Sequence, residues 1–435
     1  MNPVDQAEAL IRDPQKRHVH MLGIGGIGMA GLARLLQQRG CDVSGCDAQA
    51  NRQTQWLESH GVSVSIGHDA AHISSEIDWV IRTTAVPDSH PEVIAAKEQR
   101  IPVLRRGEVL PALLRGRRTI AVSGTHGKTT TSSLIAQVLR FCGVDCGWCI
   151  GGEVPGLDGV AGDGPVMVVE ADESDGTAAL YSPEIAVITN IEYDHMEHHA
   201  SEESFVDVFR SFAAQSEKVI YCAEDRIASE VCQSLEKSGG YRLDAECVIP
   251  DFALPGRHNL LNAQAVRSVA SALGVDDDPV LQALGRVKAP LRRFEVISQE
   301  RGITVVSDYA HHPTEIRCLI ESAQSYHPQR ILALFQPHRY TRTLALGADF
   351  PPAFEGVNEL WLAPVYAASE SPIAGGTTED LCGRFSAEWR HRLHYVTSLE
   401  QAWGEIQRQL RPGDLFLIIG AGDVVKVADW VKEDL

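Results

Sequence analysis

Residues 123–131 read Ser-Gly-Thr-His-Gly-Lys-Thr-Thr-Thr and combine residue types that bind phosphate groups. The apolar run 119–122 before them suits a strand, and the apolar residues after them have the spacing of one helical face. Small residues let backbone N–H groups close around phosphate oxygens at a helix N-terminus, where the helix dipole is positive. Lys128 adds a charge for the terminal phosphates, and Thr129 offers a hydroxyl to Mg²⁺. The stretch therefore predicts a nucleotide-binding loop.

This loop is shorter than the usual phosphate-binding pattern, in which four residues separate a glycine from Gly-Lys-Ser or Gly-Lys-Thr. Position 122 is valine, and the nearest upstream glycine, Gly124, is only three positions before Gly127. A short glycine loop can also be a tight turn without a ligand. Its place between a strand and a helix favours nucleotide binding.

A second glycine motif lies near the N-terminus, where the strand-like run 18–22 leads into Gly-Ile-Gly-Gly-Ile-Gly at 23–28. A helical segment follows, and the next strand ends at Asp47, nineteen residues beyond Gly28, where dinucleotide-binding folds place a ribose-binding carboxylate. Taken alone, this pattern indicates NAD. The same geometry holds any diphosphate, and the glycines can also serve only to let a helix pack closely on a strand. The motif predicts a nucleotide-like ligand without identifying it.

Carboxylates follow the apolar run 166–169, after which residues 170–175 read Glu-Ala-Asp-Glu-Ser-Asp. Mg²⁺ prefers hard oxygen ligands and bridges phosphates, so we expect Glu170, the first residue after the run, to be its ligand. A solvated acidic turn is the alternative. Farther along, the strand-like run 185–188 leads to His195, which can approach a second metal ion or the phosphates, or can be an ordinary polar residue.

Two pairs of side chains, each three residues apart, are candidates for recognising substrates. Asn259 and Asn262 share one helical face, and their amides can read an adenine edge; capping of the helix by Asn259 is the alternative. Arg339 and Arg342 follow another strand-like run and can clamp a carboxylate through paired hydrogen bonds. As plain surface charges, the two arginines would have no such role.

The composition is that of a globular protein, with 435 residues, 44% hydrophobic and 22% charged, enough for two to four domains. A formal charge of −19 without a basic block argues against nucleic acid or a membrane surface as a partner. No segment approaches the ~18 apolar residues of a membrane span, and the N-terminal residues do not read as a targeting signal. The ten cysteines are scattered, which favours reduced thiols in the cytoplasm, and we expect the C-x-x-C spacing of Cys146 and Cys149 to be fortuitous.

Eight motifs resemble those of the Mur ligase family in their order, and the similarity covers nearly the whole chain. They read GIGGIGM, GTHGKTT, EADESD, NIEYDHM, GRHNLLNA, DYAHHPTE, FQPHRYTRT and VYAASESPI. Within the family they are most similar to the members that add the first amino acid in peptidoglycan synthesis. The resemblance implies an α/β fold of three domains: a Rossmann-like UDP-binding domain at 1–115, a central P-loop ATPase domain at 116–296, and a Rossmann-like amino-acid-binding domain at 297–435.

The resemblance also implies an activity, the ATP-dependent ligation of L-alanine to the lactoyl carboxylate of UDP-N-acetylmuramate through an acyl phosphate. It implies a cytoplasmic enzyme, monomeric or homodimeric, whose domains close around ATP, Mg²⁺ and the substrates. The residues that it assigns to ATP are Gly124, Thr125, His126, Gly127, Lys128, Thr129, Thr130, Asn259, Asn262 and Asp308. Those assigned to the UDP-substrate are Gly25, Gly26, Ile27, Gly28 and Asp47; to alanine, His338, Arg339 and Arg342; to Mg²⁺, Thr129, Glu170 and His195; and to catalysis, Lys128, His195, Arg339 and Arg342.

The chain departs from the family pattern in three places. The segment between Cys222 and Gly256 is short, which predicts that part of the central domain's peripheral sheet is missing. Ala310 replaces a usual glycine, and Tyr193 replaces a common proline. Three alternatives remain: a ligase that attaches a preformed peptide to UDP-N-acetylmuramate during wall recycling, an NAD-dependent oxidoreductase built on the first glycine motif and Asp47, and a non-catalytic nucleotide-binding regulator.

Overall fold

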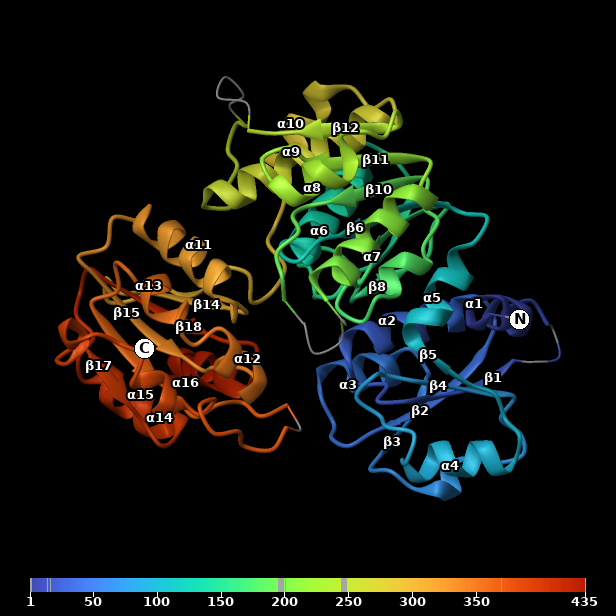
Figure 1. The fold of residues 1–435 in the computed structure, drawn as a ribbon, viewed down its shortest axis with the longest axis horizontal. Helices are drawn as coiled ribbons and strands as arrows, with labels where there is room; N and C mark the ends of the chain where they lie inside the picture. Colours follow the sequence, from blue (N-terminus) through green and yellow to red (C-terminus); the bar gives the residue numbers. More distant parts are fainter. Residues whose placement is uncertain are drawn as a thin grey trace. The chain divides into compact units, whose positions relative to one another are not determined.

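The computed structural model of the chain describes residues 2–13, 15, 17–194, 199, 201–243, 249–368 and 370–434. The chain forms two compact units, one of residues 1–253 with 261–288 and the other of residues 254–260 with 289–435. The described residues form three β-sheets, two in the first unit and one in the second (Figure 1). None of the helices in the described ranges is both long enough and apolar enough to cross a membrane.

The N-terminal sheet has five parallel strands in the order β3-β2-β1-β4-β5. Its strands are β1 (His18–Leu22), β2 (Asp42–Asp47), β3 (Ser63–Ile66), β4 (Trp79–Arg82) and β5 (Val103–Arg105). The strand order reverses beside β1, and in such sheets ligands bind at the carboxyl ends of the strands next to the reversal. The first glycine motif begins there. The helices of this domain are α1 (Pro3–Arg12), α2 (Ile27–Gln38), α3 (Arg52–Ser59), η1 (Ala70–His72), α4 (Pro91–Glu98) and α5 (Arg106–Leu114).

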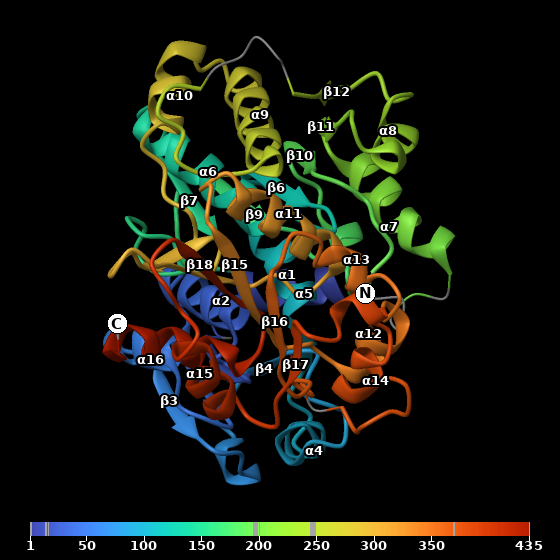
Figure 2. The same ribbon diagram turned by 90° about the vertical axis from the view of Figure 1, so that its left-hand side faces the viewer.

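The central sheet has the order β12-β11-β10-β6-β9-β7-β8 and is parallel except for β8, which pairs antiparallel with β7. Figure 2 shows α6 and α9 on one side of its strands and α7 and α8 on the other. The strands are β6 (Arg118–Ser123), β7 (Cys146–Cys149), β8 (Ala161–Gly162), β9 (Val166–Glu170), β10 (Ile185–Ile188), β11 (Lys218–Cys222) and β12 (Ser238–Tyr241). The helices are α6 (Lys128–Phe141), η2 (Thr177–Leu180), α7 (Glu202–Gln215), α8 (Arg226–Cys232), α9 (Arg257–Ala272) and α10 (Asp277–Leu284).

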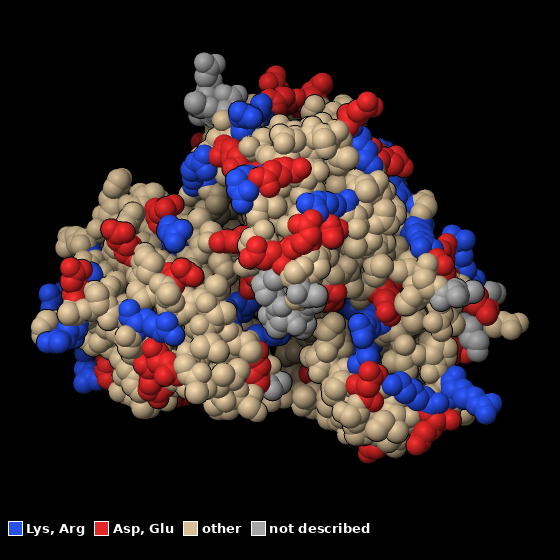
Figure 3. Space-filling model, in the orientation of Figure 1, with Lys and Arg blue, Asp and Glu red and all other residues tan. Residues whose placement is uncertain are grey.

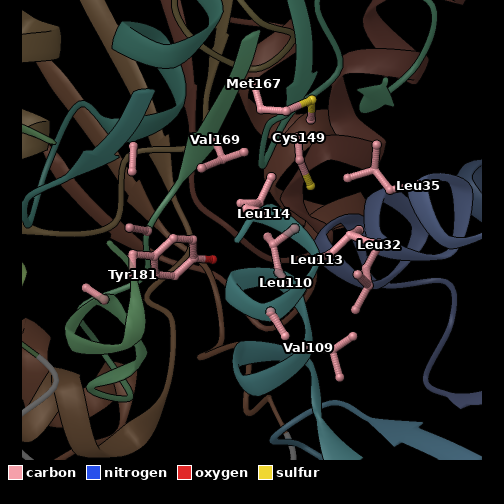
Figure 4. Close-up of a cluster of buried hydrophobic side chains, with 14 of the residues drawn as sticks. Leu32, Leu35, Val109, Leu110, Leu113, Leu114, Cys149, Met167, Val169 and Tyr181 are labelled. Atoms are coloured by element: carbon pink, nitrogen blue, oxygen red, sulfur yellow. The ribbon is translucent and has the colours of Figure 1, made fainter. Parts of the chain in front are cut away.

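One hydrophobic core joins the N-terminal and central domains within the first unit. Figure 4 shows Leu110, Leu113 and Leu114 of α5 between leucines of α2 and residues of the central sheet. All three leucines are at most 5% exposed. Apolar burial of this extent stabilises by about 25 cal/mol per Å² of surface removed from water, so the two domains pack as one body.

The second unit contains a sheet in the order β13-β14-β18-β15-β16-β17, in which only the β13–β14 pair is antiparallel. Alternate residues of its strands fill two separate cores, one on each face, because successive side chains of a strand point to opposite faces. The strands are β13 (Glu295–Ser298), β14 (Thr304–Asp308), β15 (Arg330–Phe335), β16 (Glu359–Leu362), β17 (Leu393–Tyr395) and β18 (Asp414–Ile419). The helices are α11 (Pro313–Gln324), α12 (Tyr340–Ala345), α13 (Phe350–Ala353), α14 (Thr378–Cys382), η4 (Ala387–Trp389), α15 (Leu399–Gln407), η5 (Asp423–Val425) and α16 (Lys426–Asp434).

The short segment between Cys222 and Gly256 contains α8 and β12 in its described part. Strand β12 ends the described order of the central sheet on that side. The absence of part of a larger peripheral sheet from this segment stays a prediction. On the face drawn in Figure 3, acidic and basic side chains are interspersed.

Candidate nucleotide and substrate sites

The predicted phosphate loop connects β6 to α6, which begins at Lys128. The strand–loop–helix order expected from the sequence is confirmed. Gly124 and Gly127 have φ angles of 137° and 82°, which residues with a side chain rarely adopt. A Cβ atom on Gly124 would lie 2.0 Å from Thr189 Oγ1, so glycine is required at this position.

The segment that follows β10 holds the loop in place. Asn190 accepts a hydrogen bond from the His126 N–H at 2.9 Å and donates one to the His126 carbonyl at 2.9 Å. Thr125 Oγ1 donates to the Glu192 carbonyl at 2.8 Å and accepts from the Glu192 N–H at 2.9 Å. The loop conformation therefore depends on residues more than sixty positions away in the sequence. The sequence did not predict a role for Asn190; its place two residues after β10, a strand that pairs with β6, was the available signal.

Lys128 contacts a carboxylate that was not expected at this position. Its Nζ donates to Glu173 Oε1 at 2.8 Å, to the Gly124 carbonyl at 2.7 Å and to the Thr125 carbonyl at 3.2 Å. Burial favours the neutral amine, but Glu173, Asp172 and Glu170 outweigh it and raise the pKa of Lys128. Burial raises the pKa of Glu173 to about 7, although the ammonium opposes this shift. The lysine is charged at pH 7 and is held beside the loop.

Thr129 and Glu170 have the donors that Mg²⁺ requires. The Thr129 hydroxyl donates to Glu170 Oε2 at 3.2 Å, so the two expected ligands are brought together at the start of α6. Glu170 Oε1 also accepts from the Gly151 N–H at 2.6 Å, which orients the carboxylate. A hydroxyl and a carboxylate at a helix N-terminus fit a hard divalent ion bound to phosphate oxygens. The third expected metal ligand, His195, lies outside the described residues.

Two charged side chains contact the first glycine motif. This motif includes the expected residues Gly26 and Ile27. Asp47 Oδ2 accepts from the Gly25 N–H at 2.9 Å and so holds the turn between β1 and α2. A Cβ atom on Gly28 would lie 2.3 Å from Arg106 Nη1, so this glycine makes room for the guanidinium. Arg106 Nη2 lies 3.9 Å from Asp172 Oδ2, in the acidic motif after β9. Arg106 therefore links the two candidate sites of the first unit, and it was not predicted.

The two asparagines of α9 make different contacts. Asn262 Oδ1 accepts from Thr131 Oγ1 at 3.1 Å, and a Cβ atom on Gly127 would lie 3.1 Å from the same oxygen. The structure thus places Asn262 against the phosphate loop. Asn259 Nδ2 donates to the Pro255 carbonyl at 2.7 Å, one turn earlier in the chain. The Asn259 side chain thus donates to a carbonyl, whereas a side chain that caps a helix N-terminus accepts a hydrogen bond from a backbone N–H group.

The second unit brings together the residues expected to bind an amino acid. Arg342 Nη1 lies 3.3 Å from His338 Nδ1, and the His338 ring is stacked on Tyr366. Arg342 is only 7% exposed, so the alternative of a plain surface charge is wrong for this residue. Arg339 has a φ of 69°, a backbone conformation that is costly for arginine, and its N–H donates to the Tyr366 carbonyl at 2.9 Å. Tyr366 was not predicted as a site residue, although it lies in the last of the quoted motifs.

Two further titratable groups of the second unit are shifted by burial. Burial raises the pKa of Asp308, although two backbone N–H groups donate to its carboxylate at 2.6 and 2.7 Å. Burial and the charge of Arg293 lower the pKa of His258 to about 4, against the opposing charge of Glu315. His258 is therefore neutral at pH 7.

The C-x-x-C pair lies in strand β7. Residues three apart in a strand point to opposite faces, so Cys146 and Cys149 do not converge on one ligand. Burial raises the pKa of Cys146 to about 11 and that of Cys149 to about 12. The expectation of a fortuitous spacing agrees with this geometry.

Comparison with known proteins identifies the family to which this fold and this phosphate loop belong. The sequence matches three parts of one family, described as "Mur ligase family, catalytic domain" at residues 18–118, "Mur ligase middle domain" at 122–246 and "Mur ligase, glutamate ligase domain" at 292–422. The chain belongs to the Mur ligase family. The predicted three-domain α/β fold is confirmed.

Individual relatives with assigned names show which members of the family the chain is similar to. The chain is 36% identical to a UDP-N-acetylmuramate–L-alanine ligase of Desulforamulus reducens, and the match covers 94% of this chain and 96% of that protein. The crystal structure of a UDP-N-acetylmuramate-alanine ligase from Thermotoga maritima has a TM-score of 0.82 and 29% identity, covering 96% of this chain and 98% of that one. A murein peptide ligase from Psychrobacter arcticus shares the fold, with a TM-score of 0.73 at 21% identity over 96% of this chain and 99% of that one.

Proposed function

We propose that the chain uses ATP to ligate L-alanine to the lactoyl carboxylate of UDP-N-acetylmuramate, releasing ADP and phosphate, in peptidoglycan synthesis. The observation that carries the proposal is the phosphate loop, in which Lys128 is charged and Thr129 is bonded to Glu170 at the start of α6. The substrates follow from the relatives with that printed name. We place the reaction in the cytoplasm, where ATP is available, and the domains at 1–115, 116–296 and 297–435.

The chemistry explains why ATP is needed. A carboxylate is a poor electrophile, and transfer of the γ-phosphoryl group turns it into an acyl phosphate with a good leaving group. Lys128 and the first-turn N–H groups of α6 stabilise charge on the transferring group, and Thr129, Glu170 and His195 would hold the Mg²⁺ that neutralises more of it. The amine of alanine then attacks the acyl carbon, and phosphate leaves.

The other expected residues bind and orient the substrates. Asn262, with Asn259 and Asp308, is assigned to the adenosine part of ATP, and the glycine motif at 25–28 with Asp47 to the UDP part of the substrate. His338, Arg339 and Arg342 orient alanine through its carboxylate, because a planar guanidinium bonds a carboxylate at two points. This requirement selects an amino acid over a simple amine.

Phosphate release from Mg·ATP with UDP-N-acetylmuramate tests the proposal when free L-amino acids and the recycling tripeptide are compared. We expect release that depends on L-alanine. Release only with the tripeptide would assign the chain to the recycling ligases, and no release with any acceptor would favour a non-catalytic regulator. Reduction of NAD by a small substrate would instead support the oxidoreductase alternative.

Lys128→Ala should abolish ligation and leave the far-UV circular dichroism unchanged. Lys97→Ala is the matched control, because Lys97 is an exposed lysine of the same unit whose Nζ contacts Asp88 at 2.8 Å. Normal turnover of the Lys128 variant would remove the loop from the mechanism.

A further inference from the structure

A cluster of metal-ligand side chains lies in the N-terminal domain and is not used by the proposed reaction. It consists of His20 on β1, Cys46 on β2, His72 at the end of η1 and Glu92 in the first turn of α4. One potential ligand atom from each of the four residues lies within 4.8 Å of all the others. Three of the four side chains are buried, and His72 is partly buried.

The sheet register explains why the two strands contribute to one cluster. In the parallel β1–β2 pair, His20 is opposite Ser44 and Leu22 is opposite Cys46. His20 and Cys46 are therefore diagonal neighbours on the same face, since residues two apart in a strand share a face. Helix η1 and the start of α4 contribute His72 and Glu92 to the same cluster.

Glu92 lies at the centre of the cluster. Cys46 Sγ lies 3.3 and 3.2 Å from its two carboxylate oxygens, and His72 Nδ1 lies 2.6 Å from Oε1. The carboxylate is completely buried, and no lysine or arginine contacts it in the described ranges. A buried carboxylate is costly unless a cation or several hydrogen bonds compensate its charge. Hydrogen bonds from Cys46, His72 and the Asp69 N–H, the last at 3.3 Å, compensate part of this cost, and a metal ion would supply the opposite charge.

His20 provides the independent evidence for a ligand. Its Nδ1 bonds Ser44 Oγ at 2.9 Å, and its Nε2 is buried with no hydrogen-bond partner among the described residues. The side chain is 4% exposed, so an unmade bond on Nε2 is expensive. Metal-binding histidines have this arrangement, with one ring nitrogen on the metal and the other held by a polar partner.

We propose that His20, Cys46, His72 and Glu92 bind a Zn²⁺ ion. Nitrogen, sulfur and oxygen donors in a set of four are typical of tetrahedral zinc, and a thiolate disfavours Mg²⁺ and Ca²⁺. Ligands at 2.0–2.3 Å from zinc are about 3.3–3.8 Å apart, so a contraction of roughly 1 Å closes the widest pairs. Cys46 binds as the thiolate and releases its proton to solvent, and the metal replaces the hydrogen bond between His72 and Glu92.

Two more histidines surround the site. His68 Nδ1 lies 3.3 Å from Cys46 Sγ and 3.3 Å from Glu92 Oε2, and His90 Nδ1 lies 3.6 Å from Glu92 Oε2. His68 is close enough to hydrogen bond both Cys46 and Glu92 and so to orient them, whereas His90 Nδ1 has no hydrogen-bond partner among the described residues. The metal would tie β1, β2, η1 and α4 to one point, so its role is structural.

Cobalt substitution of the full-length chain tests the site without nucleotide. Protein freed of metal with a chelator is titrated with Co²⁺, and Zn²⁺ is then added in competition. We expect one equivalent of Co²⁺ at micromolar concentration, with a near-ultraviolet thiolate-to-cobalt band that Zn²⁺ abolishes. Cys46→Ser should remove the band and His20→Leu should weaken zinc binding at least tenfold, whereas Cys41→Ser, another buried cysteine of this domain, should change neither.

Three results would overturn the proposal. The wild-type chain can fail to bind a stoichiometric metal, a result that needs no variant to fold. The band can persist in Cys46→Ser, which would place the thiolate elsewhere. It can also disappear in Cys149→Ser and not in Cys46→Ser, which would move the site to β7.

Discussion

Replacing Glu173 by glutamine should strengthen nucleotide binding, and more so at high pH than at low pH. Glu173 Oε1 accepts a hydrogen bond from Lys128 Nζ at 2.8 Å, and this bond competes with the contact that the lysine makes to nucleotide phosphates. Glutamine keeps the size and an oxygen acceptor but has no charge. In the variant, Lys128 therefore loses a weaker interaction when it moves to contact the nucleotide phosphates.

The magnitude follows from the bond and from the pKa. The bond to glutamine stays charge-assisted because the lysine is ionised, so the substitution removes only the attraction between the two charges, on the order of 1 kcal/mol, or roughly fivefold in affinity. Burial raises the pKa of Glu173 to about 7. The carboxyl group is then about one-tenth ionised at pH 6 and about nine-tenths at pH 8. The ratio of wild-type to variant Kd should rise from near one to about five over this range.

Calorimetric titration with Mg²⁺ and a non-hydrolysable ATP analogue measures this ratio at pH 6, 7 and 8. Protonation of the ATP analogue affects both proteins equally, so it cancels in the ratio of the two Kd values. Asp175→Asn is the matched control: it removes a carboxylate of the same motif that bonds Thr177 at 2.6 Å. A ratio that does not change with pH, or a variant that binds more weakly at pH 8, would refute the competition between Glu173 and the phosphates.

Three further predictions concern other parts of the chain. Arg339→Ala should raise the KM for alanine at least tenfold and leave that for ATP within twofold, with Arg408→Ala as a control; equal changes in both constants would remove Arg339 from the amino-acid site. The folded-state pKa of His258 is about 4 and the unfolded value about 6.5, so its stabilising contribution is complete above pH 6.5 and is lost as the pH falls towards 4. Between pH 7.5 and 5, the free energy of unfolding from urea titrations should therefore fall by about 2 kcal/mol less in His258→Gln than in the wild type. An equal fall in the two proteins would contradict this prediction. Leu113→Ala should lower the free energy of unfolding by about 2–5 kcal/mol, whereas the exposed Leu180→Ala should cost under 1; similar losses would mean that the core under α5 is loosely packed.

The phosphate loop shows which features the sequence predicts well. Its strand, glycines and helix start are local, and the structure confirms a strand over the apolar run 119–122, with observed bounds 118–123, and a helix that begins at Lys128. The bonds that shape the loop come from residues 189–192, and no local pattern indicates which residues of one loop will meet another. Asn190 was therefore missed, although its motif was recognised.

The choice between two carboxylates shows a second limit. Glu170 and Glu173 lie in the same motif, and the sequence favoured Glu170 as the metal ligand because it directly follows the apolar run 166–169. The structure places it beside Thr129, but it also places Glu173 on Lys128. Residues after a strand no longer alternate between two faces, so their directions depend on how the turn packs. Periodicity has no information about that turn.

The N-terminal glycine motif is explained by contacts over a longer range. Its pattern alone suggested NAD, with Asp47 on a ribose, yet the Asp47 carboxylate accepts the Gly25 N–H and so helps to shape the turn. The Arg106 guanidinium occupies the space that a side chain at position 28 would take, and Arg106 in turn faces Asp172 of the central domain. A motif that reads as a self-contained nucleotide fingerprint is thus partly a domain contact. Asp172 lies between two cations, because it faces Arg106 of the N-terminal domain and its charge also raises the pKa of Lys128 in the phosphate loop.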